Sequence, residues 1–385
     1  MAEAARSGSG ELAAYLALAQ IPGIGPARLR TLLDAFGSAV GAQTAPAGAI
    51  AALPGFGPAA ANAVRAAGRK GGEDILRSLD HLGARVLLPG DSEFPPLLAE
   101  IAEPPAALFV WGDATVLSRP AAAIVGSRNH TPYGATAARF LTSGVARAAV
   151  VVSGMARGLD AIAHEATLEA GGTTVGVLGN GFGVVYPAAN RGLYERVSRE
   201  GCLVSELPPG ERPRVSTFPR RNRIIAGLAG VTVVVEAAVN SGALITADCA
   251  LEQGRSVLAV PGPITSSTSE GCNKLIQQGA KPALSVGDIL EELGLSTASQ
   301  RLEALSGGPI PGPRPGDSPD LRPPQDLTPL QRTLWDSLVT QPTHVDTLVA
   351  GVGQEVGAVL TALTELELRG LVRQRPGMIF ALEGK

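Results

Sequence analysis

The sequence predicts an α/β protein with a doubly wound, mostly parallel sheet, preceded by a helical domain and followed by a winged-helix domain. Three observations predict this organisation. Short β-branched runs alternate with helical stretches between residues 119 and 294, a glycine–proline turn repeats near the N-terminus, and a segment rich in proline and glycine precedes the C-terminal part. We therefore expect domains at residues 1–80, 81–300 and 327–385, with a linker at 301–326.

The composition excludes several classes of protein. Hydrophobic residues make up 45% and charged residues 17% of the 385 residues, so general disorder is excluded. No apolar run reaches the roughly 18 residues of a spanning helix, and no secretory signal is evident, so we expect a cytoplasmic protein that does not enter the membrane. Three widely spaced cysteines argue against a disulfide framework or a cysteine-based zinc site. Because the net charge is −3, only local basic clusters could attract nucleic acid.

Two similar segments near the N-terminus, Ile21–Gly37 and Leu53–Gly68, each read Pro-Gly-apolar-Gly-Pro before a helical stretch. The repeat is typical of tandem helix-hairpin-helix or SAM-like units. Glycines in such turns let backbone N–H groups approach a phosphate. Packing without DNA contact is the alternative, especially for the second copy, which lacks the arginines of the first. Accessory DNA contacts are expected at Gly23, Gly25, Arg28 and Arg30.

Five β-branched runs make up the expected sheet, and polar, glycine-rich segments follow them. The runs are Ala121–Val125, Val150–Val152, Thr173–Leu178, Val231–Val235 and Ser256–Val260. Ligands of parallel sheets bind beyond the carboxyl ends of the strands, so these segments are candidates for a site. None has the spacing of GxGxxG for dinucleotides or GxxxxGK[ST] for phosphates. At Ser241–Gly242 and Gly271–Asn273, small side chains and free backbone donors would instead face a sugar-phosphate backbone.

The strongest charge signal is the segment Arg212–Arg223, which contains five arginines and no acidic residue. Guanidinium groups match the geometry of phosphate and stack on bases. Together with Arg128 and Arg157, this segment predicts a basic pocket within a slightly acidic protein. A solvated loop or structural ion pairs are the alternatives.

Long motifs in the core resemble one family. They read AIVGSRNHTPYG (123–134), VSGMARGLDAIAH (152–164), VLGNGFGVVYPAANRGL (177–193), SELPPG (205–210), FPRRNRIIAGLAG (218–230), VVVEAAVNSGALITADCALEQGR (233–255) and AVPGPITSSTSEGCNKLIQQGAK (259–281). This ordered series resembles the DNA-processing protein A family, DprA or Smf.

The resemblance implies an extended Rossmann-like domain that binds single-stranded DNA, forms a homodimer and loads the RecA recombinase during natural transformation. It implies no cofactor and admits other competence proteins as partners. In the family the pocket is formed by the arginine of the GSR motif and the basic FPxRNR segment, and we add neighbours at the strand ends. The expected contacts are Gly126, Ser127, Arg128, Ser153, Gly154, Arg157, Arg220, Arg221, Asn222, Arg223, Ser241, Gly242, Asn273 and Lys274. Such a pocket favours single strands with little sequence preference.

An enzymatic function is the alternative. Asp160 and His164 could share a helix face as a metal or acid–base pair, but no third ligand has suitable spacing, so we expect a local hydrogen bond instead. Nucleotide phosphoribohydrolases of the same superfamily build their pocket around PGGxGTxxE. Residues 240–252 read NSGALITADCALE and do not reproduce that pattern. We therefore expect a protein that is not an enzyme and that holds no metal.

The C-terminal part has the pattern of a winged helix. Thr328–Gln331 reads as a helix cap, helices are expected at His344–Val349 and Gln354–Arg369, and residues 371–382 read as a β-hairpin. The last of these helices carries three glutamates before its first basic residue, Arg369, so it is not expected to read the major groove. A protein contact or a regulatory role is as strong an interpretation as phosphate contact by the wing.

Overall fold

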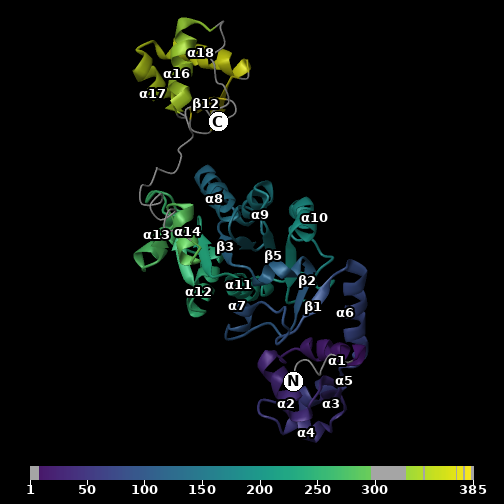
Figure 1. Ribbon diagram of the computed structural model, residues 1–385. Helices are drawn as coiled ribbons and strands as arrows, with labels where there is room; N and C mark the ends of the chain where they lie inside the picture. The colour runs from purple at the N-terminus through teal and green to yellow at the C-terminus, as the bar shows by residue number, and fades with distance from the viewer. Residues whose placement is uncertain (1–7, 296–326, 341–342, 370, 376–377, 383–385) are drawn as a thin grey trace. The chain divides into compact units, whose positions relative to one another are not determined.

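The computed structural model describes residues 8–295, 327–340, 343–369, 371–375 and 378–382. The chain divides into two compact units, Met1–Gly307 and Gly308–Lys385, each of which is described by itself (Figure 1). The linker predicted at residues 301–326 lies outside the described residues, and the predicted domain boundaries stay predictions.

One sheet of nine strands forms the centre of the first unit. Its strands are β1 (Arg85–Leu87), β2 (Leu108–Gly112), β3 (Ala121–Val125), β4 (Val150–Ser153), β5 (Thr174–Leu178), β6 (Cys202–Ser205), β7 (Val231–Val234), β8 (Ser256–Ala259) and β9 (Lys281–Pro282). Their order is β1-β2-β6-β5-β4-β3-β7-β8-β9, and all neighbours from β6 to β9 are parallel. At one edge, β1 and β2 pair antiparallel. The predicted doubly wound, mostly parallel sheet is confirmed.

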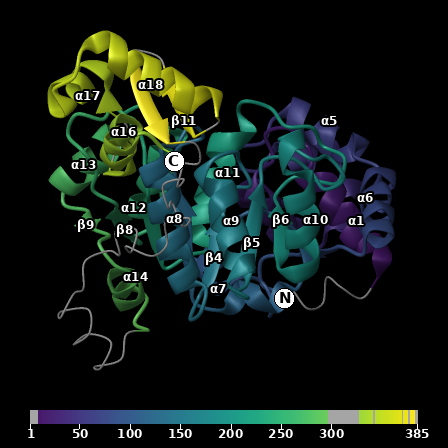
Figure 2. The ribbon, with the colours of Figure 1, turned by 90° about the horizontal axis from the view of Figure 1, so that it is seen from above.

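Helices cover both faces of the sheet (Figures 1 and 2). One face carries α8 (Pro132–Val145), α9 (Leu159–Glu169), α10 (Arg191–Glu200) and α14 (Val286–Glu292), and the other carries α7 (Pro96–Ala99), α11 (Thr217–Gly227), α12 (Gly242–Glu252) and α13 (Glu270–Gln277). In β3, Ala122 and Ile124 pack against the helices of the face that carries α8 and α9. The alternate residues of β3 pack against the helices of the face that carries α11 and α12. Because both faces are buried, these strands read as continuous apolar runs. Two short 3₁₀ turns, η2 (Ala114–Ser118) and η3 (Ala188–Asn190), connect elements.

The order of the strands reverses between β3 and β7. From β3 the chain runs outward through β4 and β5 to β6, then returns to β7 beside β3 and runs the other way to β9. The carboxyl ends of β3 and β7 therefore lie side by side while their connections diverge. Ligands of open α/β sheets bind in the crevice that such a reversal leaves.

The N-terminal helices form two similar hairpins. They are α1 (Ser9–Ala19), α2 (Pro26–Phe36), α3 (Ala39–Thr44), α4 (Ala47–Ala51), α5 (Pro58–Ala66) and α6 (Arg69–Leu82). The turns α1–α2 and α4–α5 hold Gly23 and Gly55 at φ values of 81° and 80°, so the repeat seen in the sequence is also a repeat in space. These helices pack against the sheet, because Leu16 and Leu79 share a core with Phe109.

The second unit is a winged helix, as predicted. It consists of α16 (Pro329–Thr340), β10 (Thr343–His344), α17 (Val345–Val352), α18 (Val356–Leu368), β11 (Val372–Arg375) and β12 (Ile379–Leu382), with the strands in the order β10-β12-β11. Thr328 and Gln331 form the expected reciprocal cap: each backbone N–H donates to the other's side chain. Two glutamates of α18 are engaged inside the unit, because Glu365 accepts from Gln331 and Glu367 from the Gln374 N–H.

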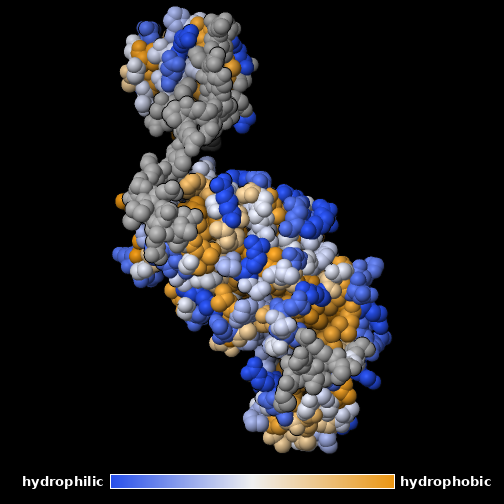
Figure 3. Space-filling model, viewed as in Figure 1, coloured by the Kyte–Doolittle hydropathy of each residue, from blue (hydrophilic) through white to orange (hydrophobic). Residues whose placement is uncertain are grey.

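Hydrophilic and hydrophobic side chains are interspersed over the face that Figure 3 shows. Within the described residues, no single helix is long and apolar enough to cross a membrane. The bent pair of α17 and α18 meets the length and composition only when both helices are taken together.

Candidate nucleic-acid interface

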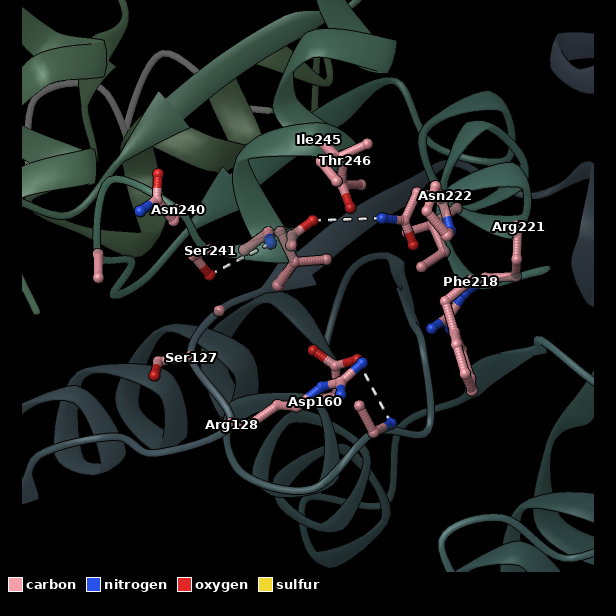
Figure 4. A pocket seen from close by; sticks show the side chains of 18 of the residues that line it. Ser127, Arg128, Asp160, Phe218, Arg221, Asn222, Asn240, Ser241, Ile245 and Thr246 are labelled. Carbon is pink, nitrogen blue, oxygen red and sulfur yellow. Dashed lines mark hydrogen bonds between the residues drawn. The ribbon is translucent and has the colours of Figure 1, made fainter. Parts of the chain in front are cut away.

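A cavity of about 610 Å³ opens where the carboxyl ends of β3 and β7 meet. Its walls come from the turn after β3, the turn after β7, and α11. Figure 4 shows Arg128 and Asp160 on one wall, Phe218 and Arg221 on a second, and Ser241 on a third. The reversal of strand order therefore places the arginine of the GSR motif opposite the basic helix α11.

Hydrogen bonds hold the turns around this cavity. The Ser127 N–H donates to the carbonyl oxygen of Glu236 at 2.7 Å, which ties the turn after β3 to the end of β7. The Asn222 amide donates to the carbonyl oxygen of Gly242 at 3.2 Å, which ties α11 to the start of α12 (Figure 4). At the same helix start, Ser241 accepts from the Ala243 N–H, as a helix cap does.

Glu236 is a structural residue whose role the sequence did not reveal. Its side chain is 2% exposed, and its carboxylate accepts hydrogen bonds from the Thr131 N–H, the Thr131 hydroxyl and the Thr268 hydroxyl, each at 2.8 Å. A buried carboxylate needs such donors. The indication in the sequence was that a single acidic residue, Glu236, ends the apolar run VTVVVE. Glu236 joins the turn after β3 to the turn after β8.

Arg221 and Asp160 lie together at the base of the cavity. Arg221 is 6% exposed and donates to the carbonyl oxygen of Val177 at 2.6 Å, while its Nε has no partner among the described residues. Gly154 makes room for the pair: a Cβ there would overlap Arg221 Nη1 and lie 2.6 Å from Asp160 Oδ2. The Asp160 carboxylate accepts from the Ala156 N–H at 3.4 Å, the local hydrogen bond expected from the sequence.

Burial dominates the ionisation of these groups. It lowers the pKa of Arg221 to about 10; the Asp160 carboxylate opposes this shift and Arg128 adds to it. Arg221 therefore stays charged at neutral pH. Burial also raises the pKa of Asp160, and Arg221 is the main group that opposes the rise.

His164 does not form a pair with Asp160. Its Nδ1 lies 2.7 Å from the hydroxyl of Thr174, and burial lowers its pKa to about 3. The imidazole is therefore neutral at neutral pH. Among the described residues, no group of three or more His, Cys, Asp or Glu side chains could hold a metal ion.

Two further cavities adjoin the first. One of about 270 Å³ shares Arg128, Tyr186 and Phe218 with it and extends past Gly154 and Arg157, beyond β4 and β5. The other, of about 450 Å³, shares Asn240 and Ser241 and extends along α13 past Lys274. Neighbouring cavities share lining residues, so the three adjoin one another; together we call them the rim trough, which follows the carboxyl ends of β5, β4, β3 and β7 and continues between α12 and α13.

Three cations on the rim trough are exposed: Arg128, Arg157 and Lys274. In the part of the chain that the structure describes, none of them pairs with a carboxylate. Two aromatic rings also line the trough, although the sequence had not marked them. The rings of Tyr186 and Phe218 lie 5.5 Å apart, and Tyr186 is 47% exposed. The trough thus offers free cations beside stacking surfaces.

Most of the predicted contact residues line the trough, but some do not. The structure brings together Gly126, Ser127, Arg128, Gly154, Arg157, Arg221, Asn222, Ser241, Gly242 and Lys274. Ser153 is buried and donates to the carbonyl oxygen of Ile124. The Asn273 side chain holds the backbone of Gly262 through two hydrogen bonds.

The three arginines of the basic segment that lie in α11 split between two faces of that helix, which corrects the expectation that the segment forms one pocket. Arg214 precedes α11 and pairs with Glu211. Arg220 and Arg223 both bind the Glu206 carboxylate, at 3.1 and 2.5 Å, and neither lines the trough. Residues three apart share a helix face, whereas adjacent residues do not. Arg221 therefore faces the trough while its two neighbours form a structural ion pair, the alternative that the sequence left open.

The accessory residues lie in the N-terminal hairpins and not in the trough. Arg28 donates to the carbonyl oxygen of Gly23 at 2.9 Å, and its guanidinium carbon lies 5.9 Å from the centroid of the Phe56 ring. Arg28 therefore links the two hairpin turns. Gly25 caps α2, and Arg30 is exposed on that helix. Their contact with DNA stays a prediction.

Comparison with protein families gives two matches. Residues 85–294 match the family described as DNA recombination-mediator protein A, and residues 318–378 match the DprA winged helix domain. Protein Smf of Synechocystis is 34% identical over 392 residues, covering 96% of this chain and 98% of that protein. Protein Smf of Escherichia coli is 42% identical over 294 residues, covering 76% of each chain.

Solved structures with the same fold include two bacterial proteins. DNA processing protein A of Streptococcus pneumoniae is 35% identical, with a TM-score of 0.65, and the match covers 72% of this chain and 97% of that one. The protein of Helicobacter pylori, whose structure is described as giving insight into a unique single-stranded DNA binding mode, is 27% identical with a TM-score of 0.50. That match covers 55% of this chain and 96% of the other.

Proposed function

Because the chain belongs to the DNA recombination-mediator protein A family, also called DprA or Smf, we propose that it binds single-stranded DNA in the rim trough and loads RecA recombinase onto it during natural transformation. One observation carries the DNA-binding part: three adjoining cavities lie in a row along the carboxyl rim of the sheet, and they are lined by exposed cations that have no carboxylate partner among the described residues. A row of adjoining cavities suits a polymer better than a small ligand.

Phosphates are held by charge and by backbone donors. Arg128, Arg157 and Lys274 supply exposed charges along the trough, and Arg221 supplies one at its base. The start of α12 adds backbone N–H groups and the positive end of a helix dipole. None of these groups reads a base, so binding has little dependence on sequence.

Bases are held by stacking. Tyr186 and Phe218 offer ring faces beside the cations, and every base has a π-face that can stack on them. Bases in a duplex are already stacked and paired, so they cannot use these rings without being separated. This difference makes the trough selective for single strands.

Nucleotide cleavage, the enzymatic alternative, has little support in the site. Among the described residues that line the main cavity, Asp160 is the acidic one, and it is buried beside Arg221. Glu252, at the end of NSGALITADCALE, is exposed at the end of α12 and does not line the trough. The relatives carry DNA-processing names, which favours a protein that binds DNA without cleaving nucleotides.

A binding experiment tests the proposal. Fluorescence anisotropy of a labelled dT oligonucleotide, with a duplex of equal length as competitor, should show strong preference for the single strand. Nucleoside monophosphates incubated with the protein should release no free base. RecA filament formation on coated single strands tests the proposed loading. Sedimentation of the free protein tests the homodimer that the family resemblance implies. Equal affinity for duplex, or release of base, would contradict the proposal.

A further inference from the structure

The segment Tyr186–Ala189 lines the second cavity, and the asparagine that follows it, Asn190, has no role in the proposed function. Tyr186, Pro187 and Ala189 line that cavity. Asn190 follows them at the N-cap of α10. Asparagine at this position usually accepts a hydrogen bond from the backbone of its own helix. Asn190 makes no such bond. Its side chain is used elsewhere.

The amide of Asn190 binds the backbone of two other residues that line this cavity. Its Nδ2 donates to the carbonyl oxygen of Met155 at 3.0 Å and to that of Ala156 at 3.2 Å. These two carbonyl groups immediately precede Arg157, which lines the same cavity. One side chain therefore ties two segments of the lining together next to an exposed cation.

The backbone that accepts these bonds has an uncommon conformation. Met155 has a φ of 56°, in the left-handed region that residues with a side chain rarely adopt. Its side chain is 2% exposed and belongs to the same core as Leu203. Arg157, two residues later, is exposed. The left-handed residue thus turns the chain from the core to the rim, and such a conformation persists only where its surroundings hold it.

The other end of this turn is fixed against the turn after β3. Gly158 has a φ of 82°, and a Cβ there would lie 2.7 Å from the carbonyl oxygen of Arg128. The Leu159 N–H donates to the carbonyl oxygen of Ser127 at 3.2 Å. Asn190 supplies the second point of attachment, so Arg157 lies between two fixed points and close to the backbone of Arg128.

We propose that Asn190 is a positioning residue: it fixes the turn Gly154–Gly158 so that Arg157 meets a phosphate next to the one that Arg128 holds. Asn190 itself does not contact DNA. The inference rests on the proposed function, because it requires a phosphate contact by Arg157. Loss of Asn190 weakens binding only through Arg157, and this distinguishes positioning from a general effect on the fold.

The test is a double-mutant cycle in the full chain. Asn190→Ala, Arg157→Ala and the double variant are titrated with a labelled dT oligonucleotide at several salt concentrations. We expect each single variant to bind roughly tenfold more weakly, the change expected from losing one charge-assisted hydrogen bond. The slope of log K against log salt should fall by about 0.7 in each, as for one lost contact with a single strand. The double variant should match Arg157→Ala.

Two further variants distinguish lost positioning of Arg157 from a loss of folding. Asn190→Asp removes the N–H donors but places a carboxylate at the start of α10, which favours the helix, and it should bind at least as weakly as Asn190→Ala because the carboxylate also repels phosphate. Asn62→Ala, on the exposed face of α5, should bind like the wild type. Thermal unfolding establishes the folded fraction of each.

The outcomes separate the two proposals. If Arg157→Ala weakens binding but Asn190→Ala leaves affinity and salt slope unchanged, or if their effects add, the positioning role is wrong and the proposed function stands. If the wild type does not prefer the dT oligonucleotide, or Arg157→Ala has no effect, the phosphate contact is wrong and the inference falls with it.

Discussion

The guanidinium carbon of Arg128 lies 5.7 Å from the centroid of the Phe218 ring, at the boundary between the first and second cavities. This cation–π contact orients an arginine that has no carboxylate partner among the described residues. It also places a phosphate-binding group directly beside a stacking surface. A nucleotide offers both a phosphate and a base, so the two residues form the smallest unit of the proposed site.

Replacing Arg128 should weaken single-strand binding for every sequence. Arg128→Ala removes one phosphate contact, so the slope of log K against log salt should fall by about 0.7. Titration of dT and mixed-sequence oligonucleotides over a range of salt concentrations measures this. Arg139→Ala is the control, because Arg139 pairs with Glu165 and Glu169 on the surface and should change little. An unchanged slope for Arg128→Ala would remove it from the phosphate site.

Replacing Phe218 should weaken binding without changing its salt dependence. Phe218→Leu keeps an apolar side chain against Gly179 but loses the ring, at a cost of about 1–3 kcal/mol of binding free energy per stacked base. The same titrations provide the slope. Phe218→Tyr keeps the ring and should retain most of the affinity. A lower salt slope in Phe218→Leu would show that the ring acts through Arg128 and not by stacking.

Gly154 should not tolerate a methyl group. Gly154→Ala places a Cβ onto Arg221 Nη1, so the buried arginine must move, and overpacking of this kind costs about 1–3 kcal/mol of unfolding free energy. Urea denaturation measures the loss, and single-strand affinity should fall with it. Gly192→Ala is the matched control: it lies in α10 with open space around it, and should raise stability by up to about 1 kcal/mol. Equal stability of the two variants would disprove the tight fit.

His164 should make the fold sensitive to acid. The pKa of His164 is about 3 in the folded chain and 6.5 in the unfolded chain. Between pH 3 and pH 6.5, therefore, the imidazole binds a proton only in the unfolded state. Above pH 6.5 this group leaves the free energy of unfolding unchanged. Below pH 6.5 it lowers the free energy of unfolding by about 1.4 kcal/mol per pH unit. Urea denaturation between pH 7 and pH 4.5 measures the slope. In His164→Asn this part of the slope should vanish; an unchanged slope would exclude His164 as its source.

Removing the second unit should leave the main site intact. A chain ending at residue 305 keeps all three cavities of the rim trough, because every residue that lines them precedes residue 293. Affinity for a dT oligonucleotide should stay within about threefold of the full chain, a difference below 1 kcal/mol. Anisotropy titration of both chains measures it. A loss of tenfold or more would place a principal DNA contact in the winged helix.

The sequence predicted five of the nine strands of the sheet, β3, β4, β5, β7 and β8, because strands buried on both faces read as unbroken apolar runs. It did not identify β6, a strand of four residues flanked by polar segments, or β2 beside it, or the edge strands β1 and β9. Edge strands are held by their neighbours and lack a pattern of their own.

The sequence by itself determined the fold class, the paired hairpins and the place of the candidate site at the carboxyl ends of the strands. Those features follow from periodicity, turn glycines and strand ends, which are local properties of the chain. Only the tertiary structure decided which cations are free. Arg220, Arg221 and Arg223 are equivalent in the sequence, yet the 100° rotation between adjacent helical residues sends one of them into the trough and two to Glu206. The Glu206 carboxylate follows the carboxyl end of β6, and no spacing along the chain reveals that it lies next to Arg220 and Arg223.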